Sequence, residues 1–162
     1  MFRAMRRSSR ATSLAAALEI LKSGNYGVLS VVSDNGYPYG VPLNYAFLDG
    51  KLYFHSAVEG AKLDAIRRDP RVCFTVTTRA ELVPDALSTD YSSAIVFGRA
   101  RVVEDADERK SLVVRMTRAL SEEAYAALAR HNCVDAVASY VVVEITPEHV
   151  SGKSRSQCPR FE

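Results

Sequence analysis

Apolar residues alternate with polar ones in several short runs of the chain, the pattern typical of β-strands with one buried face. The clearest run lies between residues 37 and 47, where every second position from Tyr39 onward is apolar or aromatic. An almost continuous apolar run, YVVVEI, marks the last strand. The pattern predicts six strands, over residues 26–33, 37–47, 51–56, 71–78, 91–104 and 139–146.

Turn residues and prolines indicate how the first strands connect. The Asp-Asn-Gly sequence at 34–36 and the Asp-Gly sequence at 49–50 predict hairpins, because Asn and Gly tolerate the positive φ angles of tight turns. Pro38 and Pro42 fall in the opposite phase to the apolar residues of the second strand. Proline cannot donate a hydrogen bond to a neighbouring strand, so we expect this strand at a sheet edge or bulged near Pro42.

Helical periodicity predicts four helices. Ser13 is a suitable N-terminal cap for the first helix, in which Leu14, Leu18 and Leu21 share one face. The helices cover residues 13–22, 61–68, 105–116 and 121–131. They interrupt the strands rather than alternate with them, which favours an antiparallel sheet over a doubly wound parallel one. We therefore expect a mostly β (α+β) fold, with six antiparallel strands curled into a barrel.

Three segments lack a clear pattern. Residues 1–11 form a basic arm, the proline-containing residues 79–90 are predicted to be a loop, and residues 151–162 form a polar tail. Gly98 lies in the middle of the fifth strand, where it indicates a bulge or a close backbone approach. No repeat or linker divides the chain, so residues 1–162 are expected to form one domain.

Composition limits the classes of function. The chain has 162 residues, of which 48% are hydrophobic and 25% charged, as in ordinary folded domains. The net charge of +2, from 21 basic and 19 acidic residues, does not favour nucleic acid as the main partner. No apolar run is long enough to cross a membrane. Glu19 and Lys22 interrupt the apolar run behind the basic arm, which argues against a signal peptide.

Cysteines and histidines are sparse. The cysteines form no CxxC pair, and an odd number of them fits a reducing cytoplasm better than a disulfide framework. They are Cys73, Cys133 and Cys158. His131 and Cys133 lack a second ligand pair at suitable spacing, so no metal site is expected. Without a GxSxG sequence, hydrolase chemistry has no support.

The segment from His55 to Lys62 is the strongest candidate for binding chemistry. It joins a predicted strand to the start of a predicted helix, where free backbone N–H groups attract anions such as phosphate. Ser56 can donate its hydroxyl, and Lys62 lies in the first helical turn. A solvated loop with an exposed lysine explains the same spacing, so the residues alone leave both interpretations open. No P-loop sequence is present, which argues against nucleoside triphosphate hydrolysis.

Other candidates also have two interpretations. A bulge at Pro42 would free backbone groups for a flat heteroaromatic ring, whereas an edge strand protected by proline is the simpler explanation. A lone histidine such as His55 is more often a packing residue than a catalyst. The basic residues near the two ends are either solvated tails or a cover over a phosphate or an acidic substrate. These residues are Arg3, Arg6, Arg7, Arg10, Lys153, Arg155 and Arg160.

Several short segments, in this order and spacing, carry a family resemblance: YGVLS at 26–30, GYPYGVPLNY at 36–45, DGKLYFHSA at 49–57, Gly60, Lys62, VFGRA at 96–100 and SGK at 151–153. They resemble the pyridoxamine phosphate oxidase-like flavoproteins, which have the FMN-binding split-barrel fold. Within that superfamily the chain is most similar to the nitroimidazole-resistance (Nim-type) reductases. The segments span most of the chain and are more specific for the superfamily than for a substrate.

The resemblance implies a small split barrel that dimerises, with one FMN at each end of the dimer interface. The residues that it places along the flavin ring are Val41, Pro42, Leu43, Asn44 and Tyr45. It places His55, Ser56 and Ala57 along the flavin and its phosphate arm, with His55 also beside the substrate pocket. It makes Lys62 the partner of the phosphate, places Ser92 and Ser93 near the cofactor, and lets Lys153 reach the cofactor of the partner subunit.

The function implied by the resemblance is that of an FMN-dependent oxidoreductase, a cytoplasmic homodimer that reduces a small flat organic acceptor such as a nitroaromatic or a quinone. A nicotinamide donor would bind transiently, since no GxGxxG sequence marks a resident dinucleotide. No nucleic acid, membrane or metal ion is expected as a partner. The alternatives are a barrel that binds flavin or haem without turnover, and a related protein that uses a deazaflavin.

Overall fold

The computed structural model describes residues 2–131 and 139–156 of the chain. Cys133, Cys158 and Arg160 lie outside the described residues. The strands are β1 (Tyr26–Val32), β2 (Pro38–Asn44), β3 (Ala46–Leu48), β4 (Lys51–Ser56), β5 (Arg71–Val83), β6 (Ser88–Val102) and β7 (Val141–Arg155). The helices are α1 (Leu14–Ser23), α2 (Ala61–Arg68), α3 (Ala106–Leu120) and α4 (Glu122–His131), with short 3₁₀ turns η1 (Ser8–Arg10) and η2 (Pro84–Ala86).

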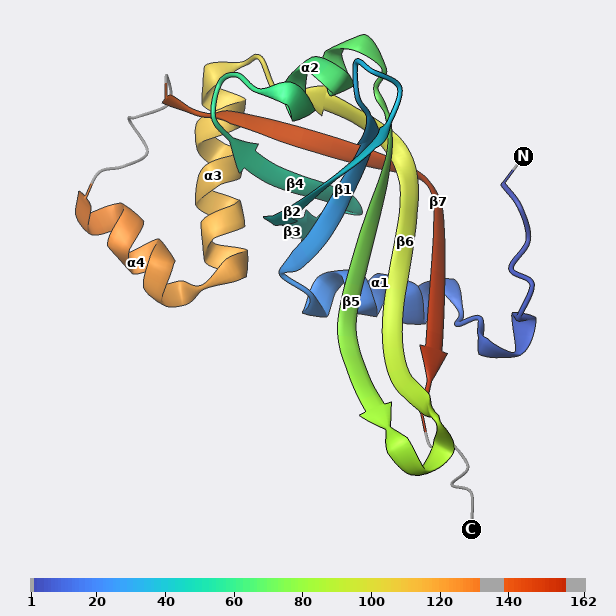
Figure 1. Ribbon diagram of the computed structural model, residues 1–162. Helices are drawn as coiled ribbons and strands as arrows, with labels where there is room; N and C mark the ends of the chain where they lie inside the picture. The colour runs from blue at the N-terminus through green and yellow to red at the C-terminus, as the bar shows by residue number, and fades with distance from the viewer. Residues whose placement is uncertain (1, 132–138, 157–162) are drawn as a thin grey trace.

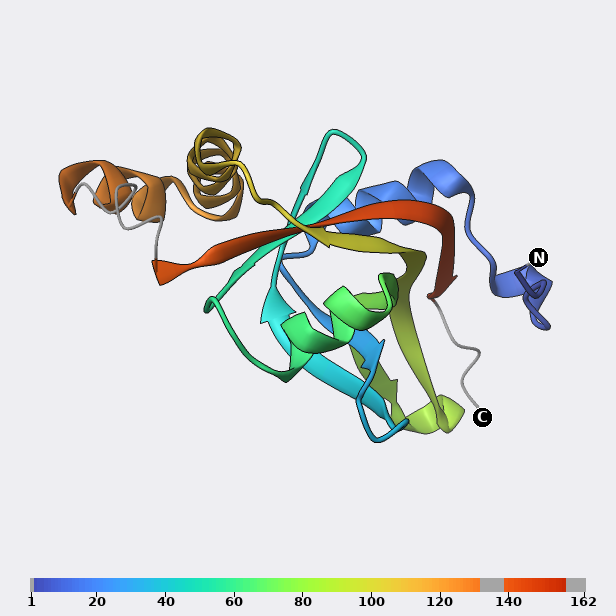
Figure 2. The ribbon, with the colours of Figure 1, turned by 90° about the horizontal axis from the view of Figure 1, so that it is seen from above.

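The strands form one antiparallel sheet in the order β2-β1-β5-β6-β7-β4-β3. It has seven strands rather than the predicted six, because the run at 37–47 is divided at Tyr45 into β2 and β3. These two strands are consecutive in the chain, yet they lie at opposite edges of the sheet. The sheet therefore curls round until its edges approach, without closing, as a split barrel does (Figures 1 and 2).

The division at Tyr45 has a clear physical cause. The Tyr45 ring is fully buried against Phe74, and its hydroxyl donates a 2.7 Å hydrogen bond to the Leu21 carbonyl at the end of α1. The backbone N–H of Tyr45 bonds to Asn25 rather than to a strand ladder. Burial raises the pKa of this phenol, which keeps it neutral in the core.

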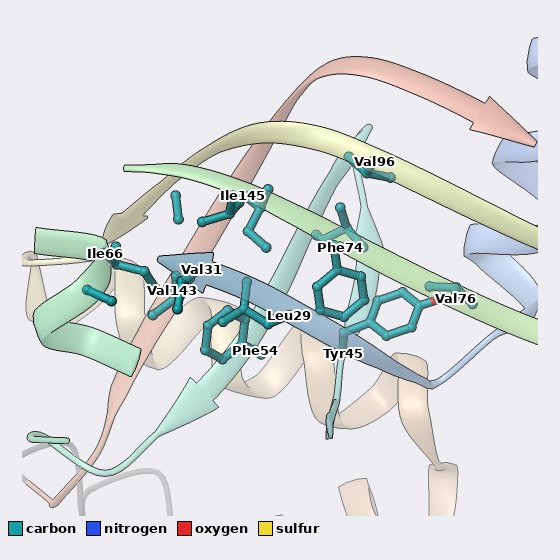
Figure 3. Packing of buried hydrophobic residues seen from close by; sticks show 14 of the residues in the cluster. Leu29, Val31, Tyr45, Phe54, Ile66, Phe74, Val76, Val96, Val143 and Ile145 are labelled. Atoms are coloured by element: carbon teal, nitrogen blue, oxygen red, sulfur yellow. The ribbon is translucent and has the colours of Figure 1, made fainter. Parts of the chain in front are cut away.

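The core fills the inside of the curled sheet. Side chains from the inner faces of five strands and from α2 pack there, and Figure 3 shows them. The largest of them are Leu29, Tyr45, Phe54, Phe74 and Ile145. A second, smaller cluster lies on the other side of β4 and β7, where Tyr53 and Val142 meet Leu112 and Met116 of α3. Helices α3 and α4 thus flank the barrel on the side opposite the N-terminal arm (Figure 2).

Most of the local features predicted from single residues are present in the structure. Ser13 caps α1 by accepting a hydrogen bond from the Ala16 N–H at 3.2 Å, and the hairpin turns contain residues with positive φ, at Gly36 and at Asp49–Gly50. β2 is an edge strand, as its prolines predict, and it pairs with β1 in regular register without a bulge. Gly98 marks a register shift between β6 and β7, and a Cβ there would lie 2.4 Å from the Thr146 carbonyl oxygen.

Three expectations about the strands and α1 are wrong. Residues 79–90 are not a loop, because β5 and β6 continue as a two-stranded ribbon that turns only at η2. Residues 151–155 are not a tail, because they complete β7 against β6. Both stretches are held by backbone pairing, and neither carries a regular apolar alternation. Leu14 is also 60% exposed, and Ala17 takes its place on the buried face of α1.

An ionic network stabilises the outer side of the sheet beside α3. Glu144 is almost fully buried and accepts hydrogen bonds from Arg101 at 2.9 Å and from Tyr53 at 3.1 Å, while the Lys51 ammonium lies 3.1 Å away. Burial alone would raise the pKa of the Glu144 carboxyl. The hydrogen bonds from Arg101, Lys51 and Tyr53 together outweigh burial and lower this pKa from 4.5 to about 2.

Because the pKa of Glu144 is lower in the folded state, its contribution to stability is present above pH 4.5 and is lost as the pH falls toward 2. Glu144→Gln is expected to lower the free energy of unfolding by about 1–3 kcal/mol at pH 7, since it removes the anion paired with Lys51 and one of the two anions paired with Arg101. The deficit should shrink at pH 3, which urea unfolding followed by circular dichroism measures. Glu19→Gln, in an exposed pair with Lys22, is the control and should change little at either pH. A pH-independent deficit would contradict this role of Glu144.

Candidate functional site

The end of β4 separates two of the expected site residues. Successive side chains on a strand point to opposite faces, and here Phe54 and Ser56 face the inside of the barrel while His55 faces outward. His55 is exposed and borders a cavity of about 200 Å³ together with Met116 and Thr117 of α3. Ser56 therefore faces the inside of the barrel and His55 faces the cavity beside α3, although they are neighbours in the sequence.

Ser56 is an unsatisfied polar group. Its side chain is 6% exposed, and among the described residues its hydroxyl has no hydrogen-bond partner. A buried hydroxyl without a partner costs roughly 1–3 kcal/mol, so most buried polar groups in folded proteins are paired. An unpaired hydroxyl at a strand end, directly before a loop, is the feature expected of a group that binds a ligand.

The start of α2 provides the complementary charge. Ala57 lies in the exposed loop after Ser56. Gly60 precedes the helix with a backbone φ of +133°, an angle that residues with a side chain rarely adopt. Lys62 lies in the first turn of α2 and makes no ion pair with any described residue. A cation at a helix N-terminus is unfavourable for the helix dipole, and an anion bound there would relieve that cost. The Ser56–Lys62 segment thus fits a phosphate group.

β2 carries the residues expected along the ring, and its Pro38 end is the one near α2, whereas its Asn44 end lies beside Asn25 after α1. Val41 and Leu43 are half buried, and Leu43 packs against the core, whereas Pro42 and Asn44 are exposed on the outer face. β2 pairs with β1 on one side only, because it is an edge strand. The Asn44 amide donates to the Asn25 carbonyl at 3.1 Å. Tyr45 is a core residue, so its side chain does not reach this edge.

The remaining site residues form a second group in a different place. Ser93 pairs with Lys153 across β6 and β7, and its hydroxyl lies 3.4 Å from the Lys153 carbonyl oxygen. The hydroxyls of Ser92 and Ser154 lie 3.3 Å apart, one position along the same pair of strands. The Lys153 ammonium lies 5.8 Å from the centre of the Tyr91 ring. Figure 1 shows α2 at one end of the barrel and this part of β6 and β7 toward the other.

The residues beside this second group are not among those expected from the sequence. Phe2 of the N-terminal arm stacks on Phe97 of β6 and on His149 of β7, with ring centroids 5.3 and 4.7 Å apart. His149 lies beyond the predicted end of the last strand, and an arm of this composition carries no periodic signal. One signal could have indicated an apolar outer surface: the spacing of Ile95 and Phe97 puts both side chains on one face of β6.

Comparison with known proteins places the chain in a family. A family model described as pyridoxamine 5′-phosphate oxidase matches residues 13–154, which include every site residue named above. The chain belongs to this family. No curated protein matches the chain in sequence.

Several solved structures have the same fold as this chain. A candidate 5-nitroimidazole antibiotic resistance protein from Bacteroides thetaiotaomicron is 22% identical, with a TM-score of 0.74 over 88% of this chain and 85% of the other. An FAD-binding protein from Mesorhizobium loti is 27% identical, with a TM-score of 0.68 over 91% and 98%. A flavocytochrome from Azotobacter vinelandii is 16% identical, with a TM-score of 0.83 over 99% and 75%. The expected fold and family are therefore confirmed.

The described residues also bear on metal sites and on membrane-spanning helices. Within residues 2–131 and 139–156, no group of three or more His, Cys, Asp or Glu side chains is arranged to hold a metal ion. None of the helices in the same part of the chain is long and apolar enough to cross a membrane.

Proposed function

We propose that this member of the pyridoxamine 5′-phosphate oxidase family is an FMN-dependent oxidoreductase. The observation that carries the proposal is the buried, unpartnered hydroxyl of Ser56, directly before a helix whose first turn holds the unpaired Lys62. Together they match the phosphate of a flavin mononucleotide. Flavin-binding proteins among the structures with the same fold support this assignment.

In this proposal each group has a separate task. The Ser56 hydroxyl and the free N–H groups at the start of α2 donate hydrogen bonds to the phosphate, and Lys62 balances its charge. The free edge of β2, from Val41 to Asn44, lies along the ring and supplies backbone donors and acceptors. The bound flavin supplies hydride and electron transfer, so no protein nucleophile is required. His55 and the α3 side chains around it shape the pocket for the acceptor.

The proposal includes a homodimer. Ser93 and Lys153 pair near the start of β6 and the end of β7. Figure 1 shows α2 toward the other end of these strands, so one copy of the chain does not bring all the expected cofactor residues together. A two-fold dimer places the same surface on both subunits, and each subunit then completes the site of the other. In this arrangement Lys153, with Ser92 and Ser93 beside it, reaches the cofactor held by Ser56 and Lys62 of the second subunit.

The proposed substrate is a small flat acceptor, such as a quinone or a nitroaromatic compound, with a nicotinamide dinucleotide as a transient electron donor. Steady-state oxidation of NADH and NADPH by the flavin-loaded protein, with and without each acceptor, tests it. Acceptor-dependent oxidation that vanishes in the flavin-free protein is the expected result. Bound flavin with no turnover of any donor and acceptor pair would contradict the oxidoreductase proposal and favour a flavin-binding protein.

Ser56→Ala gives a test with effects in opposite directions. It removes an unpaired buried hydroxyl, so the flavin-free protein is expected to be as stable as the unchanged protein or slightly more stable. FMN affinity should fall at least about tenfold, because one hydrogen bond to a charged group is lost. Thermal unfolding without flavin and a fluorescence titration with FMN measure the two effects. A destabilised protein with unchanged FMN affinity would show that Ser56 is a structural residue.

A further inference from the structure

The two-stranded ribbon of β5 and β6 extends beyond the rest of the sheet. β1 pairs with β5 only as far as Val76, and the last described residue of β7 that pairs with β6 is Arg155, opposite Tyr91. Beyond these points β5 and β6 pair with each other, and the ribbon turns at η2. Figure 1 shows the two strands running past α1 to this turn. The ribbon, residues 79–90, is therefore an arm that projects from the barrel.

Polar contacts hold the ribbon in shape. The Arg79 guanidinium lies 2.6 Å from the Glu81 carboxylate and 3.7 Å from that of Asp90 on the opposite strand. The Arg155 guanidinium donates a hydrogen bond to the Ser88 hydroxyl and so ties the end of β7 to the ribbon. An arm that is ordered in advance loses less conformational entropy when it binds a partner.

The tip of the ribbon exposes two leucines. Leu82 is 82% exposed and Leu87 is 87% exposed, more than any other large apolar side chain that the structure describes. Leu87 also has a φ of +43°, in the left-handed region that Gly or Asn adopts at lower cost. Both its backbone and its side chain are therefore unfavourable in water. Burial of the side chain in a partner would offset this cost.

The charge of the ribbon tip limits the kind of partner. Glu81 and Asp85 flank Leu82 and Leu87, and residues 80–90 contain no lysine or arginine. Lipid surfaces and nucleic acids carry negative charge, so both would repel this tip. A protein surface with positive charge suits it.

The chain itself has such a surface, at the site that the ribbon would approach in the proposed dimer. Helix α2 carries three cations, Lys62, Arg67 and Arg68, and a single acidic residue, Asp64. In the composite site, the Lys153 side chain reaches the cofactor held at the start of this helix in the second subunit. The acidic ribbon of one copy is thus complementary in charge to α2 of the other.

The ribbon also continues directly from the cofactor residues of β6. Ser93 pairs with Lys153, and Ser88 lies five residues before Ser93 on the same strand. At about 3.4 Å per residue, the tip is roughly 17 Å from the group that reaches the second subunit. A rigid ribbon whose base lies at the cofactor of the second subunit therefore continues along the surface of that subunit.

We propose that the ribbon of each subunit grips a second copy of this chain, with Leu82 and Leu87 buried against that copy. This inference rests on the proposed function, because the composite site places the base of the ribbon at the cofactor of the second subunit. It adds a contact surface beyond the cofactor residues. In a two-fold dimer both ribbons make the same contact, so each leucine is buried twice.

The dissociation constant of the dimer tests the proposal. It is measured on the full chain, in flavin-free and FMN-loaded forms, by sedimentation over a wide dilution series with fluorescence detection. Burial of one leucine strengthens association at least about tenfold. The double variant Leu82→Ser/Leu87→Asn is expected to raise the dissociation constant at least about 100-fold. Leu14→Ser is the matched control, because Leu14 is a leucine 60% exposed on α1, and it should leave the constant unchanged.

The double variant is expected to fold. Both leucines are exposed in one copy of the chain, and Asn adopts a positive φ more readily than Leu. Its circular dichroism spectrum should match that of the unchanged protein. Leu82→Ala alone, which keeps Leu87 and the turn as they are, gives a second measurement and should weaken the dimer at least about tenfold.

Each outcome supports or overturns the proposal. A dimer that the ribbon variants leave as tight as before would overturn it, as would an unchanged protein that is monomeric at every concentration. Binding of the unchanged protein to phosphatidylcholine vesicles, lost in the double variant while the dimer persists, would assign the leucines to a lipid surface instead. A dimer that depends on the ribbon in a protein that takes up no flavin would leave this contact standing and reject the proposed function.

Discussion

The Lys62→Ala variant is expected to bind FMN about 10- to 100-fold more weakly than the unchanged protein, because a contact between ammonium and phosphate contributes roughly 1.5–3 kcal/mol. Its folding should not suffer. Lys62 has no ion-pair partner among the described residues, and its charge opposes the dipole at the start of α2. The affinity is measured by quenching of flavin fluorescence, and the stability of the flavin-free protein by urea unfolding.

Two further variants show whether the positive charge at this position is responsible for the effect. Lys62→Arg keeps the positive charge and should recover most of the affinity. Lys22→Ala removes an equivalent charge from the exposed end of α1, where Lys22 pairs with Glu19, and it should leave FMN binding unchanged. Equal FMN affinity in Lys62→Ala and the unchanged protein would remove Lys62 from the site and, with it, the proposed phosphate position.

Mixing two variants with weakened FMN binding is expected to restore activity at an FMN concentration that loads the unchanged protein but neither variant. Lys62→Ala and Lys153→Ala should each form homodimers in which both sites are impaired. When the two are unfolded together and refolded, half of the dimers pair one variant with the other, and one of their two sites then has both lysines. About a quarter of the normal number of intact sites should return, since a two-fold dimer exchanges the same surface in both directions.

The control is Lys62→Ala alone, unfolded and refolded in the same way, which should regain no activity. Light scattering confirms the dimer. If the mixture of the two variants shows no more turnover than its components, Lys62 and Lys153 do not act in the same site across the interface. A monomer that still holds flavin would contradict the composite site directly.

The fold could be predicted from the sequence wherever burial or a turn imposes a pattern. The Asn-Gly and Asp-Gly turns, the edge position of the proline-containing β2 and the irregularity at Gly98 all follow from backbone restrictions of single residues. The ribbon of β5 and β6 and the end of β7 could not be predicted, because they are held by backbone pairing and polar side-chain contacts and carry no alternating apolar pattern. The break at Tyr45 depends on its hydrogen bond to Leu21, a contact between distant segments.

The candidate site could be predicted in part. The strand-to-helix position of Ser56 and Lys62 is compatible with an anion site or a solvated loop from spacing alone, and the structure adds that the Ser56 hydroxyl is buried and has no partner among the described residues. The separation of His55 from Ser56 follows from strand alternation and was available from the sequence. The packing of Phe2 against Phe97 and His149 was not, because these three residues are far apart in the chain.

The absorption spectrum of the purified protein, with mass analysis of whatever heat releases, tests the central claim most directly. The account predicts the two visible bands of an oxidised flavin and a released species with the mass of FMN. A colourless protein that also takes up no added FMN would contradict it. Such a protein would leave the Ser56 hydroxyl and Lys62 without the ligand that explains them.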